Sequence, residues 1–135
     1  MGFVESLRTC FGKYAKFDGR ASRPEFWYFY LFCFIYMFVA GFLLGMTGAS
    51  DAASGGAILI LMIPIFIPSI AVAARRLHDI NQSGWMQCIF IPGFFGDMLL
   101  GTGYVIYIVT LALWAFWFSQ VGKKGKNRFG AQPKK

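Results

Sequence analysis

Arginine and carboxylate side chains gather in three short polar segments, which are the candidates for chemistry in this chain. The segments span residues 17–27, 75–85 and 125–130. A guanidinium group forms two parallel hydrogen bonds with a carboxylate or with a phosphate. The segments are therefore expected either to staple helix ends together through ion pairs or to bind an anion such as a phospholipid headgroup. The residues considered for both roles are Asp18, Arg20, Arg23, Glu25, Arg75, Arg76, His78, Asp79 and Arg128.

Helical spacing predicts which of these side chains meet. If residues 75–79 continue the helix formed by the apolar run before them, Arg75 shares a face with His78 and Asp79. Arg76 then points elsewhere. Asp79 is expected to pair with Arg75 or with an arginine of the first segment, and the carboxylates of the first segment with arginines of the other two. Because buried polar networks usually specify structure, ion pairing is the favoured role, although the arginines outnumber the carboxylates and leave guanidinium groups for an anion.

Catalysis and metal binding find little support in the same residues. Asp79 follows His78 directly, but adjacency in sequence does not bring two side chains into a hydrogen bond, and no nucleophile stands in a recognisable motif. One histidine is too few for the usual zinc site, and the three cysteines lack metal-ligand spacing. We therefore expect no enzymatic activity, no metal and no cofactor.

The apolar runs between the polar segments predict helices that cross a membrane. The chain is 57% hydrophobic and 14% charged, whereas soluble domains carry about 25% charged residues. All 13 Lys and Arg residues fall in three blocks, at 8–23, 75–76 and 123–135. Such an excess of cations marks the cytoplasmic segments of membrane proteins. This layout explains the net charge of +7 without nucleic acid, and it makes anionic lipid headgroups the expected partner.

An all-α membrane domain with four transmembrane helices is predicted, at residues 26–45, 57–74, 84–100 and 104–121. At about 1.5 Å per residue, a helix of this length crosses a hydrocarbon layer of about 30 Å. Ser22 and Glu25 form the pattern of a capping box at the start of the first helix. The third span contains Pro92 and several glycines. It is either a broken helix, or the turn placed at 101–103 lies earlier.

The second predicted span contains Pro64 and Pro68, which lie on one helix face. Each proline removes a helical hydrogen bond, so a kink is expected. In lipid the freed carbonyl groups need a partner, for which a hydroxyl such as that of Ser69 is suited.

The two ends of the chain are predicted to be cytoplasmic, because an even number of spans returns the chain to its starting side. Residues 1–25 form a cytoplasmic segment whose first 17 residues are an amphipathic helix. This helix either lies in the membrane interface or packs on the cytoplasmic face of the protein itself. Residues 122–135 form a basic cytoplasmic tail.

Two strings in the polar segments carry a family resemblance. Gly-Arg-x-Ser-Arg-x-Glu-Phe-Trp occupies residues 19–27, and Arg-Arg-Leu-His-Asp-x-x-x-Ser-Gly-Trp occupies residues 75–85. In this order and with these apolar intervals, the chain resembles the bacterial domain of unknown function 805 family from about Phe11 to Pro133. The resemblance implies a small multi-pass protein of the bacterial inner membrane. It implies no established activity, so no catalytic residue is transferred.

The expected function is that of a structural or interaction module. Its arginine-rich cytoplasmic face would bind anionic lipid or a protein partner, which includes a second copy of the chain or another membrane protein. The alternative is a small oligomeric channel or transporter, because helices broken by Pro and Gly line such sites. Coupled transport requires an ionisable group at membrane depth, for which Asp97 is the candidate.

Overall fold

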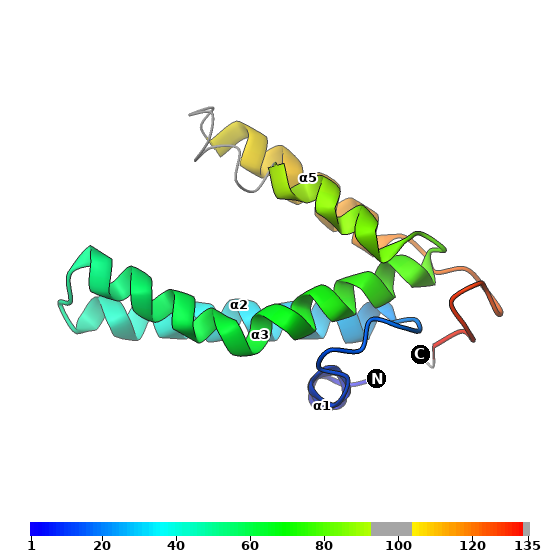
Figure 1. Cartoon of the computed structure of the whole chain (residues 1–135), viewed down its shortest axis with the longest axis horizontal. Coiled ribbons are helices and arrows are strands. Elements are labelled where there is room, and N and C mark those ends of the chain that lie inside the picture. The colour runs from blue at the N-terminus through cyan, green and yellow to red at the C-terminus, as the bar shows by residue number, and fades with distance from the viewer. Residues whose placement is uncertain (93–103, 134–135) are drawn as a thin grey trace. The chain divides into compact units, whose positions relative to one another are not determined.

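The computed structural model describes residues 1–92 and 104–133 (Figure 1). Its helices are α1 (Phe3–Gly12), α2 (Arg23–Met46), α3 (Asp51–Asp79), the 3-10 helix η1 (Gly84–Phe90) and α5 (Tyr104–Ser119). The described residues contain no named strand, which confirms the predicted all-helical class. They form two compact units, the first made of Met1–Lys16 and Pro24–Val72 and the second of Phe17–Arg23 and Ala73–Lys134.

Two long apolar helices form most of the first unit. α2 has 24 residues and α3 has 29, and both are long and apolar enough to cross a membrane. The two helices lie side by side there (Figure 1), where the Tyr30 hydroxyl donates to the Ser69 carbonyl at 3.4 Å. α2 begins directly after Ser22, at the predicted capping position. α3 contains the predicted span 57–74 but begins earlier, at Asp51, in the interval between the first two predicted spans.

α3 remains helical through both of its prolines. Pro68 removes the hydrogen bond that would reach the Pro64 carbonyl. The Ser69 hydroxyl, expected to help a freed carbonyl, instead donates to the Ile65 carbonyl at 2.6 Å, one residue further on. Such back-bonding from serine to the preceding turn bends helices. Cys33 of α2 lies 3.6 Å from the same hydroxyl, so Ser69 links the two helices at this level.

α1 packs against α2 in the first unit. Phe3 meets Tyr28 edge to face with ring centroids 6.0 Å apart, and Phe11 meets Phe29 at 5.5 Å. Small residues, Ser6 and Cys10, are the buried residues of α1, which lets the helix approach closely. α1 therefore packs on the protein itself, against aromatic side chains of α2. The helix ends at Gly12 and is therefore shorter than the predicted residues 1–17.

The second unit differs most from the predicted helices. The predicted third span begins with a 3-10 helix, Gly84–Phe90, where an α-helix was expected. Residues 93–100 of that span, Asp97 among them, and the predicted turn at 101–103 lie outside the described residues. α5 has 16 residues and ends at Ser119 instead of Val121. At about 1.5 Å per residue it is about 24 Å long, short of a hydrocarbon layer of about 30 Å.

Candidate functional site

Asp79, the last residue of α3, is the centre of a buried ionic cluster in the second unit. Its Oδ1 atom accepts a hydrogen bond from Arg20 Nε at 3.0 Å and lies 2.8 Å from Arg20 Nη2. Its Oδ2 atom accepts from Arg76 Nη1. Arg20, Arg76 and Asp79 are 6%, 1% and 5% exposed, as expected of charges that are buried only when paired. We call these three residues the Asp79 cluster.

One of the sequence predictions about this cluster is wrong. Arg76 was expected to point away from Asp79, but it pairs with Asp79 across three residues. The separation of three residues is short enough for side chains on one helix to meet, and the long arginine side chain curls back along the last turn. Arg20 comes from the first polar segment, which was one of the two sources left open for a partner of Asp79.

Backbone carbonyl groups complete the hydrogen bonding of both arginines. Arg20 Nη1 donates to the carbonyls of Gly125 at 2.6 Å and Gly130 at 3.4 Å, and Nη2 donates to that of Lys123. Every nitrogen of this guanidinium therefore has an oxygen partner. A single carboxylate faces two cations here, and the carbonyl dipoles stabilise the remaining positive charge. The Arg20 guanidinium therefore links the first and third polar segments to the end of α3.

Arg76 ties the C-terminal end of α5 and the residue that follows it to the end of α3. Its Nε donates to the Phe118 carbonyl at 3.0 Å, and its Nη2 donates to the Gln120 carbonyl. Burial lowers the pKa of Arg76, and the charge of Asp79 opposes that change. Arg76 follows the charge-free run that ends at Ala74, so this cluster belongs to the polar end of α3.

Gly122 lies against the Asp79 cluster, and its role was not recognised from the sequence. A Cβ atom at this position would overlap the Asp79 carboxylate, since even the carboxylate carbon would be 2.5 Å away. The neighbouring Lys123 amide donates to the Asp79 carbonyl at 2.9 Å. The only sequence signal is a glycine placed between an apolar run and a lysine pair, which also describes an ordinary turn.

Gly84 has a similar steric role at the start of η1. A Cβ atom there would lie 2.9 Å from the Ala74 Cβ atom and 3.3 Å from His78 Nε2. These distances are too short for an unshifted side chain. The absence of a side chain therefore lets the start of η1 pack directly on the last turns of α3.

His78 holds the first and third polar segments beside the cluster. Its Nδ1 atom lies 3.0 Å from the Gly19 carbonyl, which can only accept, so Nδ1 carries the proton. The ring stacks on Phe129 with centroids 3.8 Å apart and planes at 3°. The His78 carbonyl accepts from Asn127 Nδ2 at 2.8 Å. Burial lowers the pKa of His78, the Gly19 bond and the charge of Asp18 oppose this, and Arg128 adds to it.

The other candidate residues differ in how far they are buried and in the unit to which they belong. Arg75 is 1% exposed, and its carbonyl accepts from the Ala21 amide at 3.0 Å. Arg23 and Arg128 are exposed, and each donates to a backbone carbonyl, of Gln120 at 3.3 Å and of Asn81 at 3.1 Å respectively. Asp18 is exposed as well. Glu25 lies in the first unit, buried beside Cys10.

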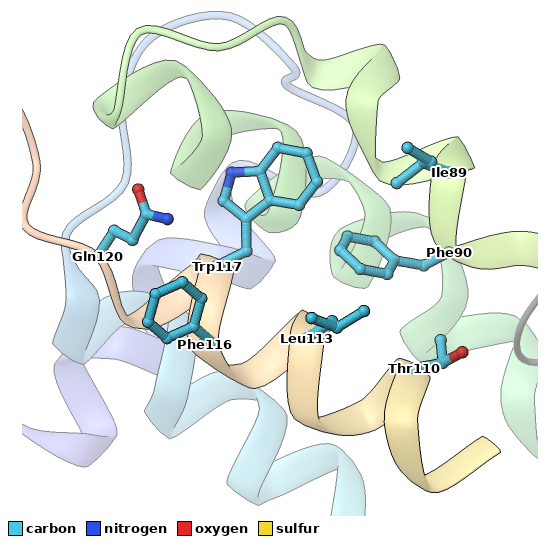
Figure 2. Close-up of a pocket in the computed structure, with 7 residues that line it drawn as sticks. All are labelled: Ile89, Phe90, Thr110, Leu113, Phe116, Trp117 and Gln120. Carbon is cyan, nitrogen blue, oxygen red and sulfur yellow. The ribbon is translucent and has the colours of Figure 1, made fainter. Parts of the chain in front are cut away.

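An apolar cleft of about 330 Å³ lies between η1 and α5 in the second unit. Ile89 and Phe90 line it from η1, while Leu113, Phe116 and Trp117 line it from α5 (Figure 2). The amino-acid sequence does not reveal this cleft, because its walls come from two separate helices and its lining residues look like ordinary apolar positions.

These features define a helical protein whose described residues include two helices long and apolar enough to cross a membrane, together with a buried arginine–aspartate cluster. The chain belongs to the family described as "Protein of unknown function (DUF805)", which matches residues 14–131 and confirms the resemblance. The Escherichia coli K12 "Inner membrane protein YhaH" is 38% identical over 122 residues, 90% of this chain and 89% of the relative. "Inner membrane protein YhaI" of the same strain is 31% identical over 90% of this chain and 88% of the relative. No solved structure matches the chain.

Proposed function

We propose that this protein is a multi-pass inner-membrane module whose cytoplasmic face binds anionic phospholipid. The relatives that carry the name of inner membrane protein support this location, as do the length and apolarity of α2 and α3. The confinement of cations to three blocks supports four spans with both termini in the cytoplasm. The spans predicted from the sequence at 84–100 and 104–121 supply the remaining two crossings of this proposed topology.

The Asp79 cluster carries the proposal, because it organises the cations around it. Its arginines are occupied internally, so they are structural staples. They connect residues 17–23 and 118–130 to the end of α3. The exposed basic residues of these connected segments form what we call the cationic face: Arg23, Lys123, Lys124, Lys126 and Arg128.

Anionic lipid is the partner that this face suits best. Attraction to an anionic membrane surface stabilises binding by about 1 kcal/mol per basic residue, which is about fivefold in an equilibrium constant. The Asp79 cluster fixes the positions of these cations, and it does not use their side chains as members of its own ion pairs.

Lipid that co-purifies with the protein tests the proposal. The measured quantity is the ratio of phosphatidylglycerol to phosphatidylethanolamine retained in mild detergent. Lys123→Gln, Lys124→Gln and Lys126→Gln together are expected to lower this ratio severalfold, because three exposed cations are lost. The control is Arg8→Gln, which removes an exposed cation of α1 in the first unit. Equal ratios in the native protein and the triple variant would contradict lipid binding.

The channel or transporter alternative rests on Asp97, which lies outside the described residues. A solute flux through reconstituted vesicles that Asp97→Asn abolishes would favour that alternative over a lipid-binding module.

A further inference from the structure

We infer that the cleft between η1 and α5 holds one acyl chain of an anionic phospholipid whose phosphate binds Arg23. This inference rests on the proposed function and assigns a site to its lipid. It requires three properties of the structure: an apolar channel, a cation at one end, and a surface that a lipid can reach.

The cleft has the size and lining of an apolar ligand site. Its volume of about 330 Å³ lies within the range of about 300–1,000 Å³ that is usual for ligand pockets. Phe90 and Trp117 meet edge to face across it, with centroids 5.4 Å apart. Thr110 and Gln120 are its polar lining residues, and they lie at opposite ends of the row of side chains in Figure 2.

The Gln120 end of the cleft is positively charged. The Gln120 carbonyl accepts from Arg23 Nε at 3.3 Å and from Arg76 Nη2. Arg76 is buried, whereas Arg23 is exposed, so Arg23 is the guanidinium that an external phosphate can reach. Lys123 and Lys124 follow within four residues and are exposed. An occupant with an apolar body and an anionic end therefore complements the cleft.

The rim of the cleft is apolar and exposed. Ile89, Leu113 and Phe116 line the cleft and are all strongly exposed. In the proposed membrane location this rim faces hydrocarbon, from which an acyl chain enters directly. A helix of a second copy would also bury the rim, but it would leave the charge at the Gln120 end without a counter-ion.

Fluorescence quenching by brominated lipids tests the inference in the full-length protein in nanodiscs. In one variant Trp117 is the only tryptophan, with Trp27→Phe, Trp85→Phe and Trp114→Phe. We expect brominated phosphatidylglycerol to quench Trp117 at a severalfold lower mole fraction than brominated phosphatidylcholine, and Arg23→Gln to remove this preference. The control keeps only Trp85, which is 83% exposed and does not line the cleft, and is expected to show no preference.

A second measurement counts retained lipid molecules in protein that keeps all of its native tryptophans. Leu113→Trp fills the cleft and is expected to remove one retained phosphatidylglycerol molecule in native mass spectrometry. Ile108→Trp adds the same bulk to an exposed α5 position outside the cleft and is expected to retain that lipid.

The outcomes separate this site from the proposed function. If Trp117 shows no preference and Leu113→Trp keeps its lipid while the triple lysine variant still loses lipid, the site is wrong and lipid binding by the cationic face stands. If the triple lysine variant loses no lipid either, the proposed function fails as well. Disulfide-linked dimers of Phe116→Cys in native membranes, together with unselective quenching, would show that a second copy fills the cleft and would overturn the inference.

Discussion

The two units of this protein differ in the kind of contact that stabilises each of them internally. In the first unit, aromatic rings of α1 and α2 pack edge to face, and Ser69 links α3 to α2. In the second unit, charged side chains bind one carboxylate and a set of backbone carbonyls. Apolar packing is spread over many weak contacts. The second unit also contains a few buried charges, and removing one partner of such a pair leaves an uncompensated charge, which is costly.

The largest effect is expected from a substitution of Asp79, the carboxylate at the centre of the ionic cluster in the second unit. Asp79→Asn removes the carboxylate and leaves two buried guanidinium groups without their counter-ion. Breaking a buried ion pair in this way costs about 3–5 kcal/mol. Hydrogen exchange in detergent or nanodiscs should rise strongly in residues 17–23 and 118–133 and little in α2. Asp51→Asn, an exposed carboxylate of the first unit, is the control, and equal exchange in both variants would contradict a structural role for the cluster.

A smaller effect is expected from a single methyl group at Gly122. Gly122→Ala places its Cβ atom against the Asp79 carboxylate, and overpacking of this kind costs about 1–3 kcal/mol. The thermal unfolding midpoint in detergent is the measurement. Gly45→Ala is the matched control, because nothing lies within 4 Å of its added Cβ atom. A midpoint that falls equally in both variants would show that Gly122 has no special place in the cluster.

The smallest effect is a pH dependence at His78. Burial holds the pKa of His78 below its usual value near 6.5, so the folded state binds the proton more weakly than the unfolded state does. His78 therefore contributes full stability above pH 6.5, and this contribution falls as the pH drops from there toward the folded pKa. Asp18 and Arg128 act on the same ring with opposite signs.

Hydrogen exchange at pH 7.5 and pH 5.5 measures this effect. Amides of the second unit should exchange faster at the lower pH, after correction for intrinsic rates. The change should diminish in His78→Gln, which stays neutral at both values. A pH response that is the same in this variant would assign the titration to another group.

Residue types were enough to find the participants of the cluster but not their arrangement. Arg20, Arg76 and Asp79 were all candidates, because charges beside an apolar run need partners. The pairing of Asp79 with Arg20 joins residues 59 positions apart, and the sequence left it as one of two alternatives. The carbonyl acceptors at Lys123, Gly125 and Gly130 could not be predicted, because every residue carries such a group.

The helices show the same division. α2 and α3 cover the predicted spans 26–45 and 57–74. These spans could be predicted because a long apolar run is visible in the sequence itself. The 3-10 helix at Gly84–Phe90 was not predicted. Its close approach to Ala74 depends on where α3 lies, and local propensity does not contain that information.

The sequence by itself determined that long apolar helices alternate with three cationic blocks, because hydrophobicity and charge belong to each residue wherever it folds. The tertiary structure decided which arginines are buried around Asp79, which ones remain on the cationic face, and that a cleft opens beside Gln120. The physical reason is that burial and hydrogen bonding depend on contacts between distant segments, and a guanidinium becomes a staple or a binding group only when those contacts are fixed.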